Sequence, residues 1–178
     1  DINLVDINEA LEEFSYPASR MKLIPGIKNT VIIDDSYNSS PAALESALKT
    51  LGSLEISGRK IAVLGDMLEL GRFTMEEHKK LGILAGSFTD LIIAIGPRAK
   101  YIVEGALDAG MSEKNIIEFD DSRAAGKYLE GVIKNGDVIL VKGSQGVRME
   151  RVVEEIMAEP QRAKELLVRQ EEEWQAKG

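Results

Sequence analysis

Residues 30–42, TVIIDDSYNSSPA, decide the fold of this chain. The first four residues of this stretch, 30–33, are β-branched and predict a buried strand. Two acids and several small polar residues follow, and then Ser40 and Pro41 supply the N-cap and the first position of a helix. Strand, polar loop and helix in this order are typical of one unit of an α/β sheet, where ligands bind beyond the carboxyl ends of the strands.

The two acids of this loop, Asp34 and Asp35, are the first candidates for ligand binding. A carboxylate at this place can accept two hydrogen bonds from a ribose diol, and the helix that follows offers free N–H groups. The same acids would also suit the cap of a turn. The spacing is compatible with both interpretations.

Outward from this stretch, strands and helices alternate along most of the chain. Further apolar runs predict strands over residues 60–64, 91–95, 115–119 and 137–141. Helical spacing predicts helices over residues 41–51, 74–86, 97–109, 122–134 and 149–158. A short strand over 20–24 precedes the Pro25-Gly26 turn and should pair antiparallel with 30–33. The fold class is therefore α/β: a Rossmann-like three-layer αβα sandwich of about six strands, mostly parallel, with one antiparallel strand near the N-terminus.

The two ends of the chain carry helical patterns of their own. Residues 4–14 predict a short amphipathic helix. Residues 1–158 form the expected domain, and residues 159–178 a charged C-terminal helix or tail with a thin apolar stripe. In that tail, Trp174 would cover an edge of the core or touch another subunit, and core cover is the preferred interpretation.

Composition narrows the class of function. The chain has 178 residues, 44% of them hydrophobic and 29% charged, which suits one globular domain. A net charge of −8 argues against a nucleic-acid or anionic-membrane surface, and no apolar run approaches the roughly 18 residues that span a membrane. The chain has no cysteine, which excludes disulfides and thiolate chemistry, and we expect a cytoplasmic protein.

Three loops that leave predicted strands carry polar or glycine residues: 35–40, 66–71 and 142–146. If the strands are neighbours, these loops line one crevice. The Lys142-Gly143-Ser144 turn can hold an anion by one ammonium group and backbone N–H groups. However, neither GxxxxGK[ST] nor GxGxxG occurs in the chain, so we do not expect it to activate ATP alone.

The remaining polar candidates are weaker. His78 is the single histidine, so a multi-histidine metal site is excluded, and its place in a predicted helix favours a half-buried structural role over catalysis. Asp66 and Glu69 could bind a metal or a substrate amine, and Glu69 equally suits a solvated loop. No metal site is predicted.

Four motifs, taken together, resemble the C-terminal domain of the Mur ligases. They are PASRM at 17–21, DDSYNSSP at 34–41, GDMLELG at 65–71 with EEHKKLG at 76–82, and VKGSQGVRMERVV at 141–153. The resemblance covers nearly the whole chain up to about residue 158 and leaves out the tail.

The resemblance implies an activity for a larger parent enzyme. Within the family, the motifs are most similar to ligases that add D-alanyl-D-alanine to UDP-N-acetylmuramoyl-tripeptide. Such enzymes use ATP and magnesium to convert a carboxylate to an acyl phosphate, which the incoming amine then attacks. The partners implied are a central P-loop ATPase domain and an N-terminal domain that holds the UDP-sugar peptide. This domain would close over ATP, bind no cofactor by itself and be inactive alone.

The resemblance also implies residue roles. Arg20 is similar to a catalytic hinge arginine that reaches the ATP phosphates, and Asp35 to the acid that binds the ribose. Tyr37 and Asn38 belong to the same nucleotide-binding motif.

A second set would bind the incoming dipeptide: Asp66, Glu69, Lys142, Ser144 and Gln145. Two positions depart from the family pattern. Ser40 stands where Asn is usual, which a helix cap tolerates. Gln145 stands where Arg is expected, which affects the contact with the dipeptide carboxylate.

Two alternatives remain open. One is a sister ligase of the same fold that adds another amino acid or a glutamate, although DMLELG argues against it. The other is a stand-alone α/β binding module with no enzyme around it.

Overall fold

The structure of the protein is a computed structural model that describes residues 18–175. The helix expected over residues 4–14 lies outside the described part. One six-stranded sheet has the strand order β1-β2-β6-β3-β4-β5. The strands are β1 Lys22–Gly26, β2 Thr30–Asp35, β3 Lys60–Gly65, β4 Leu91–Ile95, β5 Ile116–Phe119 and β6 Val138–Lys142. Only the β1–β2 pair is antiparallel, as the sequence predicts.

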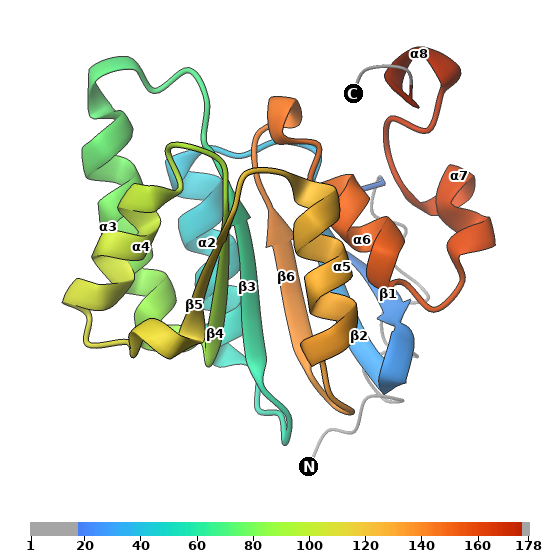
Figure 1. The fold of residues 1–178 in the computed structure, drawn as a ribbon, viewed down its shortest axis with the longest axis horizontal. Coiled ribbons are helices and arrows are strands. Elements are labelled where there is room, and N and C mark those ends of the chain that lie inside the picture. The colour runs from blue at the N-terminus through green and yellow to red at the C-terminus, as the bar shows by residue number, and fades with distance from the viewer. Residues whose placement is uncertain (1–17, 176–178) are drawn as a thin grey trace.

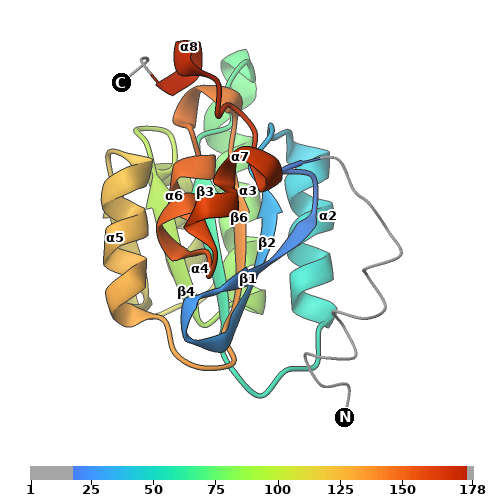
Figure 2. The same ribbon diagram turned by 90° about the vertical axis from the view of Figure 1, so that its right-hand side faces the viewer.

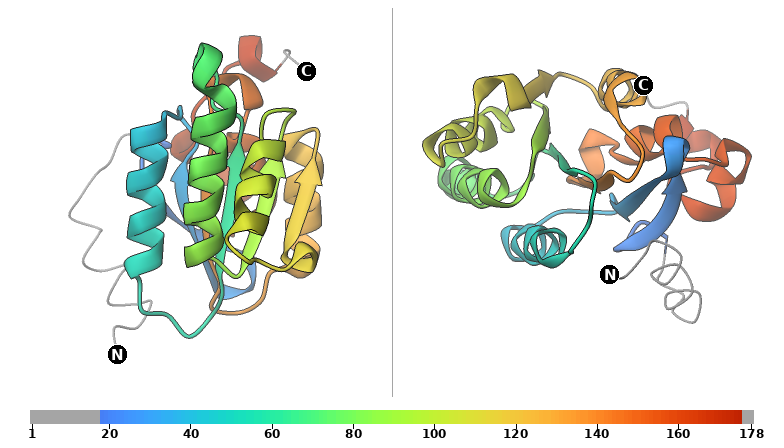
Figure 3. Two further views of the ribbon diagram at one scale, coloured as in Figure 1. Left: turned by 90° about the vertical axis from the view of Figure 1, so that its left-hand side faces the viewer. Right: turned by 90° about the horizontal axis from the view of Figure 1, so that it is seen from below.

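Helices cover both faces of the sheet, as Figures 1 and 3 show. They are α2 Pro41–Ser53, α3 Thr74–Phe88, α4 Lys100–Asp108, α5 Ser122–Val132 and α6 Glu150–Ile156. Successive strand residues point to opposite faces, so β3 supplies Ile61 and Val63 to one core and Ala62 and Leu64 to the other. The first core is closed by α5 and α6, and the second by α2, α3 and α4. The three-layer αβα sandwich is confirmed.

Local chemistry sets the element boundaries. The side chain of Ser40 caps α2 by accepting a hydrogen bond from the Ala43 N–H, and Pro41 occupies the first turn. Asp121 caps α5 in the same way. In contrast to the expected turn, Pro25 and Gly26 belong to β1. A proline fits there because β1 is an edge strand, where a missing N–H breaks no ladder bond.

The tail is folded differently from the single peripheral helix that the sequence suggests. After the 3₁₀ turn Pro160–Arg162 it forms two short helices, α7 Ala163–Leu166 and α8 Glu172–Gln175. The stripe residues Ala163, Leu166 and Leu167 are buried in the core that α5 and α6 close. Figures 1 and 2 show the chain running on from α7 to the end of the molecule where the parallel strands finish. The division at residue 158 stays a prediction.

In the described residues, no helix combines the length and apolar character that a membrane crossing requires.

Candidate functional site

The three polar loops leave neighbouring strands. β6 lies between β2 and β3, and Lys142, the last residue of β6, is in register with Asp35 of β2 and Leu64 of β3. The loops 35–40, 66–71 and 142–146 therefore begin side by side at the carboxyl edge of the sheet. They do not line one crevice as expected, because the cavity at this edge is lined by the first loop and by Lys142 but by no residue of 66–71.

A cavity of about 720 Å³ opens at this edge, lined by the chain entering β1, the end of β2 with the loop after it, and α2. Five of the predicted site residues line it together: Arg20, Asp35, Tyr37, Asn38 and Lys142. Ser39, Ser46 and Thr50 complete one wall. We call this cavity the crevice.

The charged centre of the crevice is the pair formed by Asp35 and Lys142. The Lys142 ammonium donates to Asp35 Oδ2 at 2.5 Å and to the Asn38 carbonyl at 2.9 Å, and its side chain is only 2% exposed. Asp35 Oδ1 accepts from the Met21 N–H at 3.1 Å. An ammonium group has three N–H bonds and a carboxylate about four acceptor positions, so both groups retain capacity for a ligand. Lys142 thus contacts two residues of the DDSYNSSP motif, whereas the resemblance places it near the dipeptide, and the ligand that it meets stays a prediction.

Arg20 and Tyr37 form the mouth of the crevice. The guanidinium carbon of Arg20 lies 4.4 Å from the centre of the Tyr37 ring, a cation–π distance, and Tyr37 is 43% exposed. The two neighbours of Arg20, Ser19 and Met21, have φ of 56° and 51°, in the left-handed region that costs non-glycine residues energy. Hydrogen bonds to the last two residues of β2 and to the loop after it hold both neighbours in place. Arg20 therefore lies in a segment whose strained backbone is fixed by hydrogen bonds on both sides of it.

Asp34 has a separate, internal role. It is fully buried, and its carboxylate accepts from the Ser19 hydroxyl at 2.7 Å and from the Ser36 N–H at 3.1 Å. Burial raises the pKa of Asp34 to about 6, against the lowering effect of these hydrogen bonds. The two acids therefore differ: Asp34 caps the turn, whereas Asp35 lines the crevice, and its binding of a ribose stays a prediction.

Two residues expected to bind the dipeptide, Asp66 and Ser144, hold loops together. Asp66 accepts from the Arg98 and Ala99 N–H groups, each at 2.8 Å, and pairs with the Arg98 guanidinium at 3.1 Å. Ser144 donates its N–H to the Asp66 carbonyl and accepts from the Leu68 N–H. Both side chains are buried, so their role toward a substrate stays a prediction.

The other two members of that set, Glu69 and Gln145, are exposed on the adjoining loops and line no part of the crevice. Glu69 has a φ of 66°, so its loop backbone is left-handed there. Their position leaves them accessible to a partner that approaches the carboxyl edge.

His78 was expected to be half-buried, but its side chain is fully buried. Its Nε2 accepts from the Met67 N–H at 2.9 Å, and its Nδ1 lies 2.6 Å from the Thr74 carbonyl, to which it donates as the neutral tautomer. Burial lowers the pKa of His78. The ring thus fixes the loop after β3 to α3.

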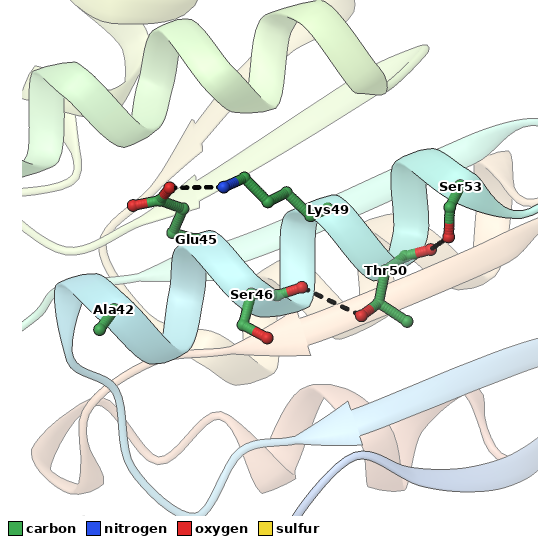
Figure 4. A pocket seen from close by; sticks show the side chains of 6 residues that line it. All are labelled: Ala42, Glu45, Ser46, Lys49, Thr50 and Ser53. Carbon is green, nitrogen blue, oxygen red and sulfur yellow. Dashed lines mark hydrogen bonds and ion pairs between the residues drawn. The ribbon is translucent and has the colours of Figure 1, made fainter.

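A second, shallower hollow of about 520 Å³ runs along the outside of α2. Figure 4 shows its side chains bonded within the helix: Glu45 to Lys49, and the Thr50 hydroxyl to the Ser46 carbonyl. Ser46 and Thr50 also line the crevice, so the hollow extends it along the helix.

Within residues 18–175, no three acid or histidine side chains gather in a way that could hold a metal ion. Sequence reasoning offered the turn cap for both acids without separating Asp34 from Asp35, and it missed the pocket face of α2. It also missed an ion cluster formed by Arg148, Glu150 and Arg169. Arg148 and Glu150 were visible only as members of the VKGSQGVRMERVV motif.

A Rossmann-like α/β sheet with a crevice beyond the carboxyl ends of adjacent strands places this chain among the α/β domains whose ligands bind at that edge of the sheet. The family described as "Mur ligase, glutamate ligase domain" matches residues 19–145, and the chain belongs to this family.

Two curated proteins that are similar to this chain carry the same enzyme name. A UDP-N-acetylmuramoyl-tripeptide–D-alanyl-D-alanine ligase of Bacillus subtilis is 30% identical over 156 residues, 87% of this chain and 34% of that protein. The enzyme of the same name from Buchnera aphidicola is 34% identical over 161 residues, 89% of this chain and 33% of that protein. The chain thus spans about a third of the length of the curated relatives it matches.

Solved structures that resemble this chain include MurF ligases. The crystal structure of MurF ligase from Thermotoga maritima in complex with ADP superposes with a TM-score of 0.67 at 29% identity, covering 93% of this chain and 35% of that one. A MurF structure from Acinetobacter baumannii has the same TM-score and identity and covers 85% of this chain and 33% of that one.

Proposed function

We propose that this chain is the C-terminal part of an ATP-dependent ligase that adds D-alanyl-D-alanine to UDP-N-acetylmuramoyl-tripeptide. The whole enzyme would act in the cytoplasm, use magnesium with its ATP, and carry a central P-loop domain and an N-terminal UDP-sugar domain. In that enzyme ATP supplies the phosphoryl group that activates the tripeptide carboxylate. This chain would close over the nucleotide, present the incoming dipeptide and be inactive alone.

The observation that carries the proposal is the crevice, where Asp35, Lys142 and Arg20 converge. An acid that can accept from a diol, a buried ammonium group and an exposed guanidinium suit the ribose and the phosphates of a nucleotide. Ser39 adds a buried hydroxyl on the same wall for which the described residues offer no hydrogen-bond partner. A ligand hydroxyl or phosphate oxygen would satisfy it.

We propose two roles around this centre. Arg20, stacked on Tyr37 at the mouth, would reach the phosphates when the domain closes, where a positive charge stabilises the charge that develops during transfer. Glu69 and Gln145, exposed on the adjoining loops, would contact the dipeptide, while Asp66 and Ser144 would set the shape of those loops. Closure would also exclude water from the activated carboxylate.

The test is ligation by the full-length protein with Asp35→Asn and Lys142→Met. Loss of a hydrogen bond to a charged group costs roughly 1.5–3 kcal/mol, so the KM for ATP should rise by about tenfold or more in each variant. The matched control is a surface pair of the same chemistry, Lys79 and Asp108, at 2.8 Å on α3 and α4. Lys79→Met and Asp108→Asn should ligate as the wild type does. Wild-type kinetics in the crevice variants would remove the site assignment.

The incoming substrate is tested separately. A panel of D-alanyl-D-alanine, single amino acids and glutamate, offered to the full-length protein with ATP, should give product with the dipeptide. Product with glutamate or another amino acid in its place would identify a sister ligase.

A further inference from the structure

Three buried charges join the tail to the body of the domain. Glu150, at the start of α6, lies between two arginines: its Oε1 accepts from Arg148 Nε at 2.5 Å, and its Oε2 accepts from Arg169 Nη1 at 3.1 Å. None of the three residues is more than 7% exposed. Among residues 18–175 this cluster joins two cations to one anion, and removing Glu150 would take the shared carboxylate from both buried guanidinium groups.

Arg169 extends from this cluster to the loop that forms the crevice. Its Nη2 donates to the Tyr37 carbonyl at 2.5 Å, and its Nη1 donates to the Ser36 carbonyl at 3.3 Å. Its guanidinium carbon lies 5.7 Å from the centre of the Tyr37 ring. Arg169 itself has a φ of 58°, an uncommon conformation for arginine, and is held there by these contacts.

Other contacts hold the same loop from the remaining sides. The Tyr37 N–H donates to the Ser19 carbonyl, the Ser36 N–H to Asp34, and the Lys142 ammonium to the Asn38 carbonyl. Arg169 alone among these partners comes from beyond residue 145, where the family match ends. The tail therefore supplies a contact to the crevice loop that the family pattern does not cover.

Trp174 closes the cluster from the solvent side. The Arg148 guanidinium donates to the Trp174 carbonyl at 2.8 Å, and the guanidinium carbons of Arg148 and Arg169 lie 5.4 and 5.7 Å from its ring centre. An aromatic ring over two cations limits their access to water and strengthens their hydrogen bonds.

We propose that residues 163–174 of the tail form a brace that sets the conformation of the loop 36–38 and so preorganises the crevice, with Arg169 as its positioning residue. This inference rests on the proposed nucleotide role of the crevice. One planar guanidinium reaches two consecutive carbonyls and a carboxylate at once, a geometry that a lysine ammonium cannot reproduce. With both carbonyls fixed, Tyr37 and Asn38 face the crevice before any ligand arrives.

The test measures Arg169→Lys and Arg169→Gln in the full-length protein by two readouts. Hydrogen exchange of the amides over residues 35–39 should become roughly tenfold faster, since the loop loses charged hydrogen bonds. The KM for ATP should rise by about tenfold while kcat changes by less than about twofold. The lysine variant, which keeps the charge, should recover only part of either effect.

The matched control is Arg162→Gln, in the same tail. Arg162 is exposed and pairs with Glu159 and Glu165, both of the tail, so this change should leave both readouts at wild-type values. Arg169 variants with a lowered Tm but control-like exchange at 35–39 would show a tail that only stabilises the fold, and would overturn the proposal. Faster exchange with an unchanged KM would overturn the positioning role.

Failure of the proposed function has a different appearance. It would show as a wild-type protein that neither uses nor binds ATP, or as an Asp35→Asn variant with wild-type kinetics. The exchange at residues 35–39 would still report on the brace in that case.

Discussion

Asp34 and Asp35 are chemically identical neighbours that the fold assigns to opposite sides of one strand. Asp34 is enclosed by Ser19 and Ser36, whereas Asp35 meets Lys142 at the crevice. The sequence could place both acids at the end of a strand, because β-branched residues precede them. It could not separate their roles, since Ser19 lies 15 residues away and contacts Asp34 only in the folded chain.

Asp34 gives a prediction about pH. Its pKa is about 6 in the folded protein against 3.8 for an exposed aspartate, so the native state binds more protons between these values, and stability falls as pH rises through this window. Asp34→Asn mimics the neutral acid and keeps an acceptor for the Ser36 N–H. Relative to the wild type, the free energy of unfolding should rise from pH 4 to 6 and reach a gain of up to about 3 kcal/mol above pH 7.

Urea denaturation of both proteins between pH 4 and 8 measures this difference. Parallel curves for the two proteins would show that Asp34 titrates normally in the fold.

His78 should affect the pH dependence of stability in the opposite direction to Asp34. Burial lowers its pKa below the ordinary 6.5, so the unfolded chain takes up the proton first and stability is lost as pH falls below about 6.5. A protonated ring could no longer accept from the Met67 N–H. His78→Gln should lower stability at pH 8 but abolish the acid-side loss, as measured by thermal unfolding from pH 5 to 8. An equal acid-side loss in the glutamine variant would exclude His78 as its cause.

At the scale of elements, two glycines of α5 make a matched pair. A methyl group at Gly126 would lie 2.8 Å from Glu155 Cβ and 3.2 Å from the Val152 backbone of α6, whereas at Gly131 it would meet nothing within 4 Å. Gly126→Ala should therefore destabilise the protein by about 1–3 kcal/mol through overpacking. Gly131→Ala should stabilise it by about 0.5–1 kcal/mol, because alanine suits a helix better than glycine does.

Chemical denaturation of the two variants checks this pair. Equal effects of the two substitutions would mean that α5 and α6 are not in close contact.

Sequence periodicity gave most elements correctly because their apolar faces are long and continuous. It failed where context overrides local chemistry. Pro25 and Gly26 look like a turn, yet an edge position lets them continue β1. The tail looks like one weak helix, but Leu166 and Leu167 reach the core only after Pro160 redirects the chain. These outcomes depend on neighbours distant in sequence.

For the molecule as a whole, the strand order predicts where the fold opens last. β3 and β6 have hydrogen-bonded strands on both sides and buried residues on both faces, whereas β1 and β5 are the edges. Native-state hydrogen exchange should be slowest in β3 and β6 and clearly faster in β5, which is only four residues long. Exchange in β5 as slow as in β6 would argue against this order.

Some contacts of the candidate site could not be predicted from the sequence, because they join residues that are distant in it. The motifs indicated three loops, and the sheet brings them to one edge. The contact between Lys142 and Asp35 depends on β6 lying beside β2, a strand order that alternating elements do not specify. Arg169 and Tyr37 are 132 positions apart in the sequence, and no local sequence pattern predicts their contact.

The pairing of Asp35 with Lys142 has a consequence for how the chain tolerates change. The two residues end adjacent parallel strands in register, and a slip of one position would send their side chains to opposite faces. The ion pair between Asp35 and Lys142 therefore forms only in the native register of β2 and β6. A substitution at either residue would remove a contact that distinguishes this register from its neighbours.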